Sequence, residues 1–244
     1  MKAKMTEKGF IHKFIATIKE TLYAVIKGML AFRRVLISYA IILLVSAILY
    51  GIYSIYPNTN LTSILATSRN TVWGIVTSIF MHSSLSHFSS NMAGLLIFIL
   101  MFTFSNSTYS LENKKRVERF TLFVSFIAAI VSNVVWVILT PVPSIGASGL
   151  VYAVMGAVSG YSLLNGLQIL NFSKIKAQKL VTIVVILMNL FLSVFLIGQV
   201  FQDVQAFLNV GERVNVIAHG TSYLIGIFSV YPYCLIKKIS IFTS

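Results

Sequence analysis

Residues 147–165 read ASGLVYAVMGAVSGYSLLN, an uncharged and mostly apolar stretch that opens with a serine and carries several glycines. Its length approaches the ~20 residues that a helix needs to cross a bilayer. Five further apolar stretches surround it, at 36–56, 86–106, 120–140, 180–201 and 214–236. Continuous hydrophobicity favours helices, because a membrane β-barrel would alternate over ~10-residue strands. We therefore predict an all-α membrane protein with a bundle of six transmembrane helices.

The composition agrees with this class, since 57% of residues are hydrophobic and only 10% are charged. Six spans leave no room for a separate soluble domain in a chain of 244 residues. We expect a basic segment at 1–35, the membrane domain at 36–236 and a short tail at 237–244. Apolar residues recur at helical spacing over 10–32, which predicts a basic amphipathic helix on the membrane face or a packing helix beneath the bundle.

The basic residues orient the predicted bundle. All except Arg69 and Arg213 lie in residues 1–35, in the loops after the second and fourth spans, or in the C-terminal tail. The positive-inside rule then places both termini in the cytoplasm. The net charge of +13 is mostly this topology signal, and binding of nucleic acid is not expected because the charges are spread over several loops. With no targeting peptide evident, we expect a prokaryotic plasma membrane.

Polar residues open three of the predicted spans. His87 and Asn91 stand at the start of the second, Ser148 at the start of the fourth and His219 at the start of the sixth. With both termini inside, these three spans all begin near the outer face of the membrane. Because polar groups in hydrocarbon are costly, their shared depth indicates a functional site.

Small residues predict that the fourth and sixth spans pack closely. They recur at three- and four-residue spacing: Gly149, Ala153, Gly156, Ala157 and Gly160, then Ala218, Ser222, Gly226 and Ser229. Close packing would bring Ser148 within hydrogen-bond reach of His219, as a serine nucleophile requires of its base. The acids all lie in predicted tails or loops: Glu7, Glu20, Glu112, Glu118, Asp203 and Glu212. A Ser-His dyad is therefore preferred to a triad.

Two further pairs of residues fit this chemistry. Tyr152 follows Ser148 by one helical turn and would hold the imidazole of His219 by stacking, although an aromatic residue can also mark the membrane interface. His87 and Asn91 share one helical face and both donate hydrogen bonds. With the backbone N–H of Ser148, they would stabilise a tetrahedral oxyanion.

Two alternatives compete with this interpretation. The first is a metal site at His82 and His87, but five residues on a helix separate side chains by about 140°. That is not the i, i+4 spacing of helical zinc ligands, so we expect no metal and no cofactor. Alternatively, the sequence Gly146-Ala147-Ser148-Gly149 would serve only to pack helices.

Taken in order, three motifs resemble those of the rhomboid family of intramembrane serine proteases. They are His82-x4-His87-x3-Asn91, Gly146-Ala147-Ser148-Gly149 followed by Tyr152 and Gly156, and Ala218-His219 followed by Gly226. The similarity covers about 60–236. It implies an endopeptidase that cuts single transmembrane helices near the outer membrane surface, without a cofactor.

The resemblance also implies roles for single residues. Ser148 would be the nucleophile, and His219 the general base and then the general acid. His87, Asn91 and the N–H of Ser148 would form the oxyanion hole, and Tyr152 would support His219.

His82 would support the site without direct chemistry. Trp73 matches the tryptophan of the family's Trp-Arg pair, in a first outer loop at 57–76, but Gly74 replaces the arginine. Ser222 stands where many members have glycine.

The resemblance further implies that substrate enters through motion of the fifth span and the loop 202–213. Two other functions remain as alternatives. One is a small six-span transporter or channel, and the other is a rhomboid-like protein that binds membrane helices without cutting them.

Overall fold

The computed structural model describes residues 26–57, 59–107, 109–172 and 216–239, together with isolated residues at 15–23 and 183–194. The fifth predicted span falls outside these ranges apart from the isolated residues, and the loop 202–213 lies wholly outside them. Most of the predicted N-terminal amphipathic helix also lies outside the described residues.

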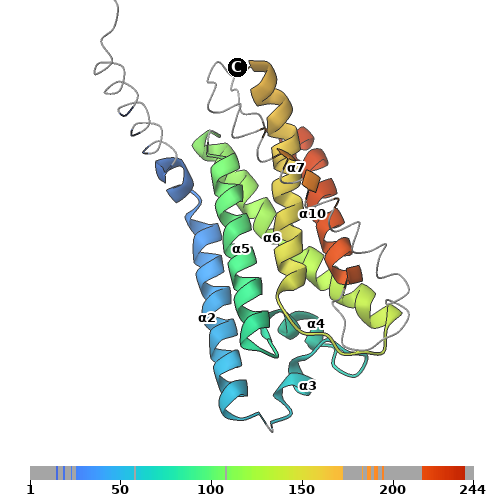
Figure 1. Cartoon of the computed structure of the whole chain (residues 1–244). Helices are drawn as coiled ribbons and strands as arrows, with labels where there is room; N and C mark the ends of the chain where they lie inside the picture. Colours follow the sequence, from blue (N-terminus) through green and yellow to red (C-terminus); the bar gives the residue numbers. More distant parts are fainter. Residues whose placement is uncertain are drawn as a thin grey trace, which may run out of the picture.

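Long helices make up most of the described chain (Figure 1): α2 (Arg33–Ile55), α5 (Leu85–Ser105), α6 (Leu111–Leu139), α7 (Ser148–Phe172) and α10 (Val216–Ile236). They coincide with five of the six apolar stretches. The prediction of an all-helical membrane protein is confirmed, since α2, α5 and α6 are each long and apolar enough to cross a membrane. Short helices fill the connection from α2 to α5: α3 (Leu61–Leu65), α4 (Gly74–Thr77) and η1 (Ser78–Phe80).

Helices α5, α7 and α10 run in the same direction. Near their starts, Gly146 at the entry to α7 lies against His87 of α5. Near their ends, Nδ2 of Asn165 on α7 donates a hydrogen bond of 3.0 Å to Oδ1 of Asn106, which follows α5. Helices α2 and α6 run in the opposite direction. The starts of α5, α7 and α10 therefore lie at one end of the bundle, as the predicted topology requires.

Helices α7 and α10 approach so closely at Gly156 and Gly226 that no side chain fits at either position. A Cβ added at Gly156 would lie 2.2 Å from the carbonyl oxygen of Tyr223, and one added at Gly226 would lie 2.3 Å from that of Ala153. Such approach of two backbones is the role of small residues in membrane helices. The predicted close packing of these two helices is confirmed.

Glu112 and Glu118 both lie inside helix α6, so the predicted loop position of these two acids is wrong. Hydropathy marks the apolar part of a helix, whereas α6 begins at Leu111 and has a charged first section. Glu118 is only 2% exposed. Its Oε1 accepts backbone N–H bonds from Arg34 (2.7 Å) and Val35 (3.1 Å). Because the first N–H groups of a helix have no partner within it, Glu118 caps α2 from a neighbouring helix.

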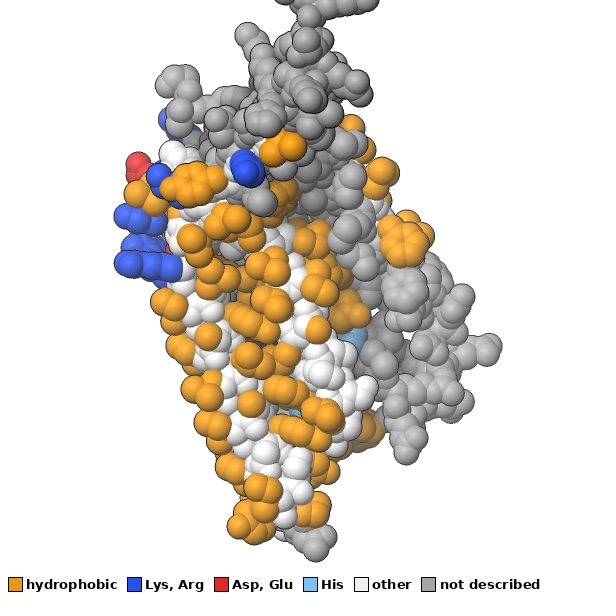
Figure 2. Space-filling view, turned by 60° about the vertical axis from the view of Figure 1, so that its left-hand side comes forward, with side chains coloured by type: hydrophobic (Ala, Val, Ile, Leu, Met, Phe, Trp, Pro, Cys, Tyr) orange, Lys and Arg blue, Asp and Glu red, His pale blue; other side chains and the backbone are white. Residues whose placement is uncertain are grey.

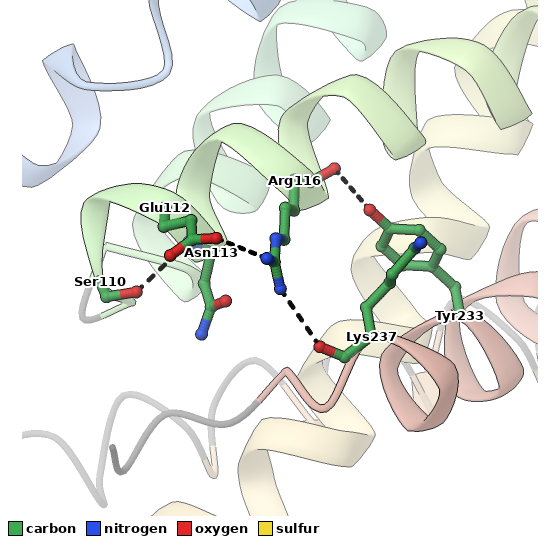
Figure 3. Close-up of polar contacts among 6 residues, drawn as sticks. All are labelled: Ser110, Glu112, Asn113, Arg116, Tyr233 and Lys237. Atoms are coloured by element: carbon green, nitrogen blue, oxygen red, sulfur yellow. Dashed lines mark hydrogen bonds and ion pairs between the residues drawn. The ribbon is translucent and has the colours of Figure 1, made fainter.

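Further contacts hold the start of α6 against the end of α10 (Figure 3). The Tyr233 hydroxyl donates to the carbonyl oxygen of Arg116 at 3.0 Å, and the Arg116 guanidinium reaches both Glu112 and the carbonyl oxygen of Lys237. Figure 2 shows apolar side chains over much of one face, with Lys and Arg gathered toward one end. This pattern suits a bundle whose sides contact lipid and whose basic end meets the membrane surface.

Candidate active site

The turn that enters α7 lies against α5. Gly146 has φ of +124°, a conformation that side chains disfavour. A Cβ added there would lie 2.6 Å from Nε2 of His87 and 3.3 Å from Nδ2 of Asn91. Ser148 follows as the first residue of α7 and is partly buried. The predicted donors of α5 and the predicted nucleophile of α7 are thus brought to the same place.

His219 approaches from α10 and is 7% exposed. Its ring stacks on that of Tyr152, with centroids 4.2 Å apart and planes 12° from parallel. Since Tyr152 lies one helical turn after Ser148, the imidazole stands beside the face of α7 that carries the serine. Among the hydrogen bonds of the described residues, there is none between Ser148 and His219. In enzymes, such bonds often tighten only once substrate is bound.

The amide nitrogen of Asn91 is buried and has no hydrogen-bond partner among the residues described. Buried donors are nearly always paired, so an unpaired one at a candidate site calls for an explanation. One explanation is that this N–H donor is available to bind a developing oxyanion. Through Gly146, this nitrogen lies close to the backbone that leads into Ser148.

His82 precedes α5 and is fully buried. Its ring meets that of His87 edge-on at 5.1 Å between centroids, and that of Phe88 at 5.4 Å. Burial, and then the nearby His87, lowers the pKa of His82 to about 4, so the imidazole is neutral at neutral pH. The described residues contain no group of three or more His, Cys, Asp or Glu suited to holding a metal ion.

The short helices before α5 hold the entry to α7, an arrangement that the sequence motifs do not predict. The N–H of Gly146 donates to the carbonyl oxygen of Ser78 at 2.8 Å. Nδ2 of Asn133, on α6, donates to the carbonyl oxygen of Ile75 at 2.8 Å and to Oγ of Ser78 at 3.1 Å. An asparagine within an apolar stretch was the available signal, because polar residues in membrane spans are costly.

The structure explains why glycine occupies position 74. A Cβ there would lie 2.0 Å from the carbonyl oxygen of Ala66, so no side chain fits in this backbone arrangement. Nε1 of the neighbouring Trp73 donates a hydrogen bond of 2.6 Å to the carbonyl oxygen of Ile64. The tryptophan therefore closes the loop on itself without the family's arginine.

Arg69 provides a second attachment for this loop. Its Nε and Nη2 donate to the carbonyl oxygens of Val137 and Ile138, at 3.2 Å and 3.4 Å. These carbonyls belong to the last turn of α6, where a cation also complements the helix dipole. Arg69 thus links the loop to the bundle in a chain that has glycine at position 74.

Ser222 follows His219 by three residues and faces α6. Its buried Oγ donates to the carbonyl oxygen of Ala128 at 3.3 Å. A Cβ added at Gly149 would lie 3.4 Å from the same Oγ, which is ordinary contact. Serine at this position is compatible with the packing of α10 against α7.

The model of the Rhomboid domain matches residues 69–236, which is more than half of the chain. The matched range includes every residue of the candidate site. No curated protein matches the chain. On this match, and with a helical bundle that brings its three motifs together, the chain belongs to the rhomboid family.

Proposed function

We propose that this protein is an intramembrane serine endopeptidase. It hydrolyses a peptide bond in or near the transmembrane helix of a membrane-protein substrate, using a Ser148–His219 dyad. The observation that carries the proposal is the stacking of His219 on Tyr152, one helical turn from Ser148. Membership of the rhomboid family supports it independently.

In the proposed reaction, Oγ of Ser148 attacks the scissile carbonyl carbon while His219 accepts the hydroxyl proton. His219 then donates this proton to the leaving amine, which forms an acyl-enzyme. A water molecule attacks the ester carbon and gives its proton to His219, and the proton returns to Ser148 as the ester bond breaks. The imidazole acts as base and acid in turn, as in other serine hydrolases.

His87, Asn91 and the backbone N–H of Ser148 donate to the oxyanion. A single donor of this kind contributes about 3–4 kcal/mol to the transition state in a serine protease. The amide nitrogen of Asn91 has no hydrogen-bond partner among the described residues, which supports its assignment, since the oxyanion would supply an acceptor. His82 supports His87, which its ring contacts.

The proposed topology has six spans, with both termini in the cytoplasm and the active site toward the outer face. Helices α2, α5, α6, α7 and α10 supply five spans, and residues 180–201 are proposed as the other. The basic residues support this orientation: Arg33, Arg34, Lys115, Arg116, Arg119, Lys237 and Lys238 lie at the starts of α2 and α6 or after α10. That is the end of the bundle opposite the candidate site.

The proposed substrates are single-span membrane proteins, reached from within the lipid bilayer. Helical backbone in a membrane is fully hydrogen-bonded, so the substrate must unwind locally before its carbonyl can meet Ser148. Small or helix-weakening residues near the cut are therefore favoured. The fifth span and the loop 202–213 are proposed to move when substrate enters.

Labelling of the solubilised protein with a fluorophosphonate probe tests the activated serine. Wild type should be labelled, whereas Ser148→Ala and His219→Ala should not. Ser89→Ala is a matched control, because Ser89 is an exposed helical serine whose Oγ, among the described residues, bonds only to nearby carbonyls of α5. Absence of label on folded wild type would contradict the proposal and favour transport or helix binding without cleavage.

A second assay uses a single-span substrate reconstituted with the protein in liposomes. Wild type should release a fragment cut near one membrane surface, and Ser148→Ala should not. Labelling without cleavage of several such substrates would retain the activated serine but reject the proposed substrate class.

A further inference from the structure

A chain of hydrogen bonds connects helix α6 to the turn that precedes Ser148. It begins at Asn133, a partly buried residue in the second half of α6. Both bonds that Nδ2 donates go to one short stretch of chain, at the carbonyl oxygen of Ile75 and at Oγ of Ser78. One amide group thus holds α4 and η1 against α6.

The next step in the chain is Ser78, which is 2% exposed. Its Oγ accepts a hydrogen bond from Nδ2 of Asn133. Its carbonyl oxygen accepts a hydrogen bond of 2.8 Å from the N–H of Gly146. The same residue therefore contacts α6 on one side and the entry to α7 on the other. Position and orientation of Ser78 determine where the Gly146 peptide can lie.

The position of the Gly146 backbone is tightly restricted. With φ of +124°, Gly146 turns a face without a side chain toward His87, where an added Cβ would lie 2.6 Å from Nε2. Two residues later comes Ser148, whose N–H and Oγ are both proposed to take part in the reaction. A shift of the Gly146 peptide would therefore move the nucleophile relative to His87 and Asn91.

We propose that Asn133 is a positioning residue for the active site. Through Ser78 it fixes the Gly146 peptide, and so aligns Ser148 with the oxyanion donors of α5. This inference rests on the proposed function. Asn133 touches neither substrate nor the reacting atoms, and its amide is preferred to an apolar side chain because two acceptors of the loop face it.

The expected consequence is a slower chemical step with unchanged binding. Misplacement of a reacting group by about 1 Å can cost about 100-fold in rate. An interaction that serves only the transition state changes kcat and leaves KM alone. We expect Asn133→Ala to lower the maximal rate of labelling by fluorophosphonate about 10- to 100-fold, with an unchanged half-saturating probe concentration.

Asn165→Ala is the matched control for lost stability. Like Asn133, Asn165 is an asparagine with two side-chain hydrogen bonds, since its Nδ2 donates to Asn106 and its Oδ1 accepts from the Tyr109 hydroxyl, although it is more deeply buried. It lies on α7 at the end remote from Ser148. Both variants should lower the melting temperature, but Asn165→Ala should retain a labelling rate close to that of wild type.

Two further variants separate a positioning role from a structural one. Asn133→Gln keeps both amide hydrogens and should recover part of the labelling rate. Ser78→Ala removes the hydroxyl but keeps the carbonyl that binds Gly146, so its effect should be smaller. Because both residues act along one chain of contacts, the double variant should be little slower than Asn133→Ala.

The experiment measures labelling rate and melting temperature of the full chain in detergent. Equal rates for Asn133→Ala and Asn165→Ala, with wild type labelled, would overturn the positioning role and leave the proposed function intact. Folded wild type that takes no label would instead overturn the proposed function and this inference together. If Asn133→Ala does not fold, Ser78→Ala decides, and a wild-type labelling rate for Ser78→Ala would overturn the inference.

Discussion

The rings of Tyr152 and His219 lie nearly parallel, with centroids 4.2 Å apart. This contact holds the imidazole from its face, whereas a triad carboxylate would hold it at a ring nitrogen. Of the acids in the described residues, Glu112 and Glu118 both lie near the start of α6, at the far end of the bundle. Among the described residues, stacking on Tyr152 is therefore the contact that orients the His219 ring.

Replacing Tyr152 tests this contact. Tyr152→Leu should lower kcat for a single-span substrate about 10-fold or more, because the imidazole loses an aromatic partner of about 0.5–1.5 kcal/mol and its fixed orientation. Tyr152→Phe keeps the ring and should stay within a few-fold of wild type. Cleavage rates in liposomes provide the measurement. A phenylalanine variant as slow as the leucine variant would show that the hydroxyl, and not the stack, matters.

Gly146→Ala should nearly abolish labelling of Ser148. The new methyl would meet Nε2 of His87 at 2.6 Å in a backbone conformation that alanine disfavours. Gly51→Ala is the control, since nothing lies within 4 Å of a Cβ there. Probe labelling and melting temperature should be measured for both. Normal labelling of Gly146→Ala would mean that the turn into α7 does not have to keep this shape.

Gly226→Ala should lower the melting temperature clearly, because its methyl would lie 2.3 Å from the carbonyl oxygen of Ala153. Overpacking of this kind costs about 1–3 kcal/mol. Gly94→Ala should be milder, since the nearest atom to its Cβ is a side-chain methyl of Val151 at 3.2 Å. Thermal unfolding in detergent compares the two. An equal loss of melting temperature in both variants would show that the close backbone contact between α7 and α10 does not set the cost of the added methyl.

Removal of the Glu118 carboxylate should uncap α2. Glu118→Ala leaves the N–H groups of Arg34 and Val35 without their acceptor, at a cost of about 0.5–2 kcal/mol for a lost helix cap. Glu118→Gln keeps one carbonyl oxygen and should lose less. The free energy of unfolding in a detergent that permits refolding is the quantity to compare. An alanine variant as stable as wild type would exclude a capping role.

Stability should fall as the pH is lowered from about 6.5 to about 4, partly through His82. Its pKa in the folded chain is about 4, against an ordinary 6.5, so below 6.5 the unfolded chain takes up a proton that the folded chain refuses. The contribution of His82 is present above pH 6.5. In His82→Phe this part of the pH dependence should disappear. Melting temperatures at several pH values would show it, and identical slopes for both proteins would count against the assignment.

Much of the helical bundle could be predicted from the sequence, because each span is a long apolar stretch and membrane helices must satisfy their own backbone. The positions of Ser148 and His219 at helix starts followed from the same pattern. The start of α6 at Leu111 could not be predicted in this way, since the hydropathy of its charged first section is that of a loop. Glu112 and Glu118 were assigned to a loop for that reason.

The contacts around Ser78 could not be predicted in the same way. Asn133, Ser78 and Gly146 are far apart in the chain, and each bond depends on how the loop folds over α6. Local patterns do not report such tertiary hydrogen bonds. The glycine at position 74 is similar, because its meaning lies in the carbonyl oxygen of Ala66 that faces it.

Polar contacts hold α7 at both of its ends. Gly146 is bonded to Ser78 at the entry, and Asn165 is bonded to Asn106 and Tyr109 near the other end. Sliding by one turn would displace α7 by about 5.4 Å and break both sets together. Helix α7, which carries Ser148, is thus held in register at both ends. A rearrangement that admits a substrate therefore has to move other helices relative to α7.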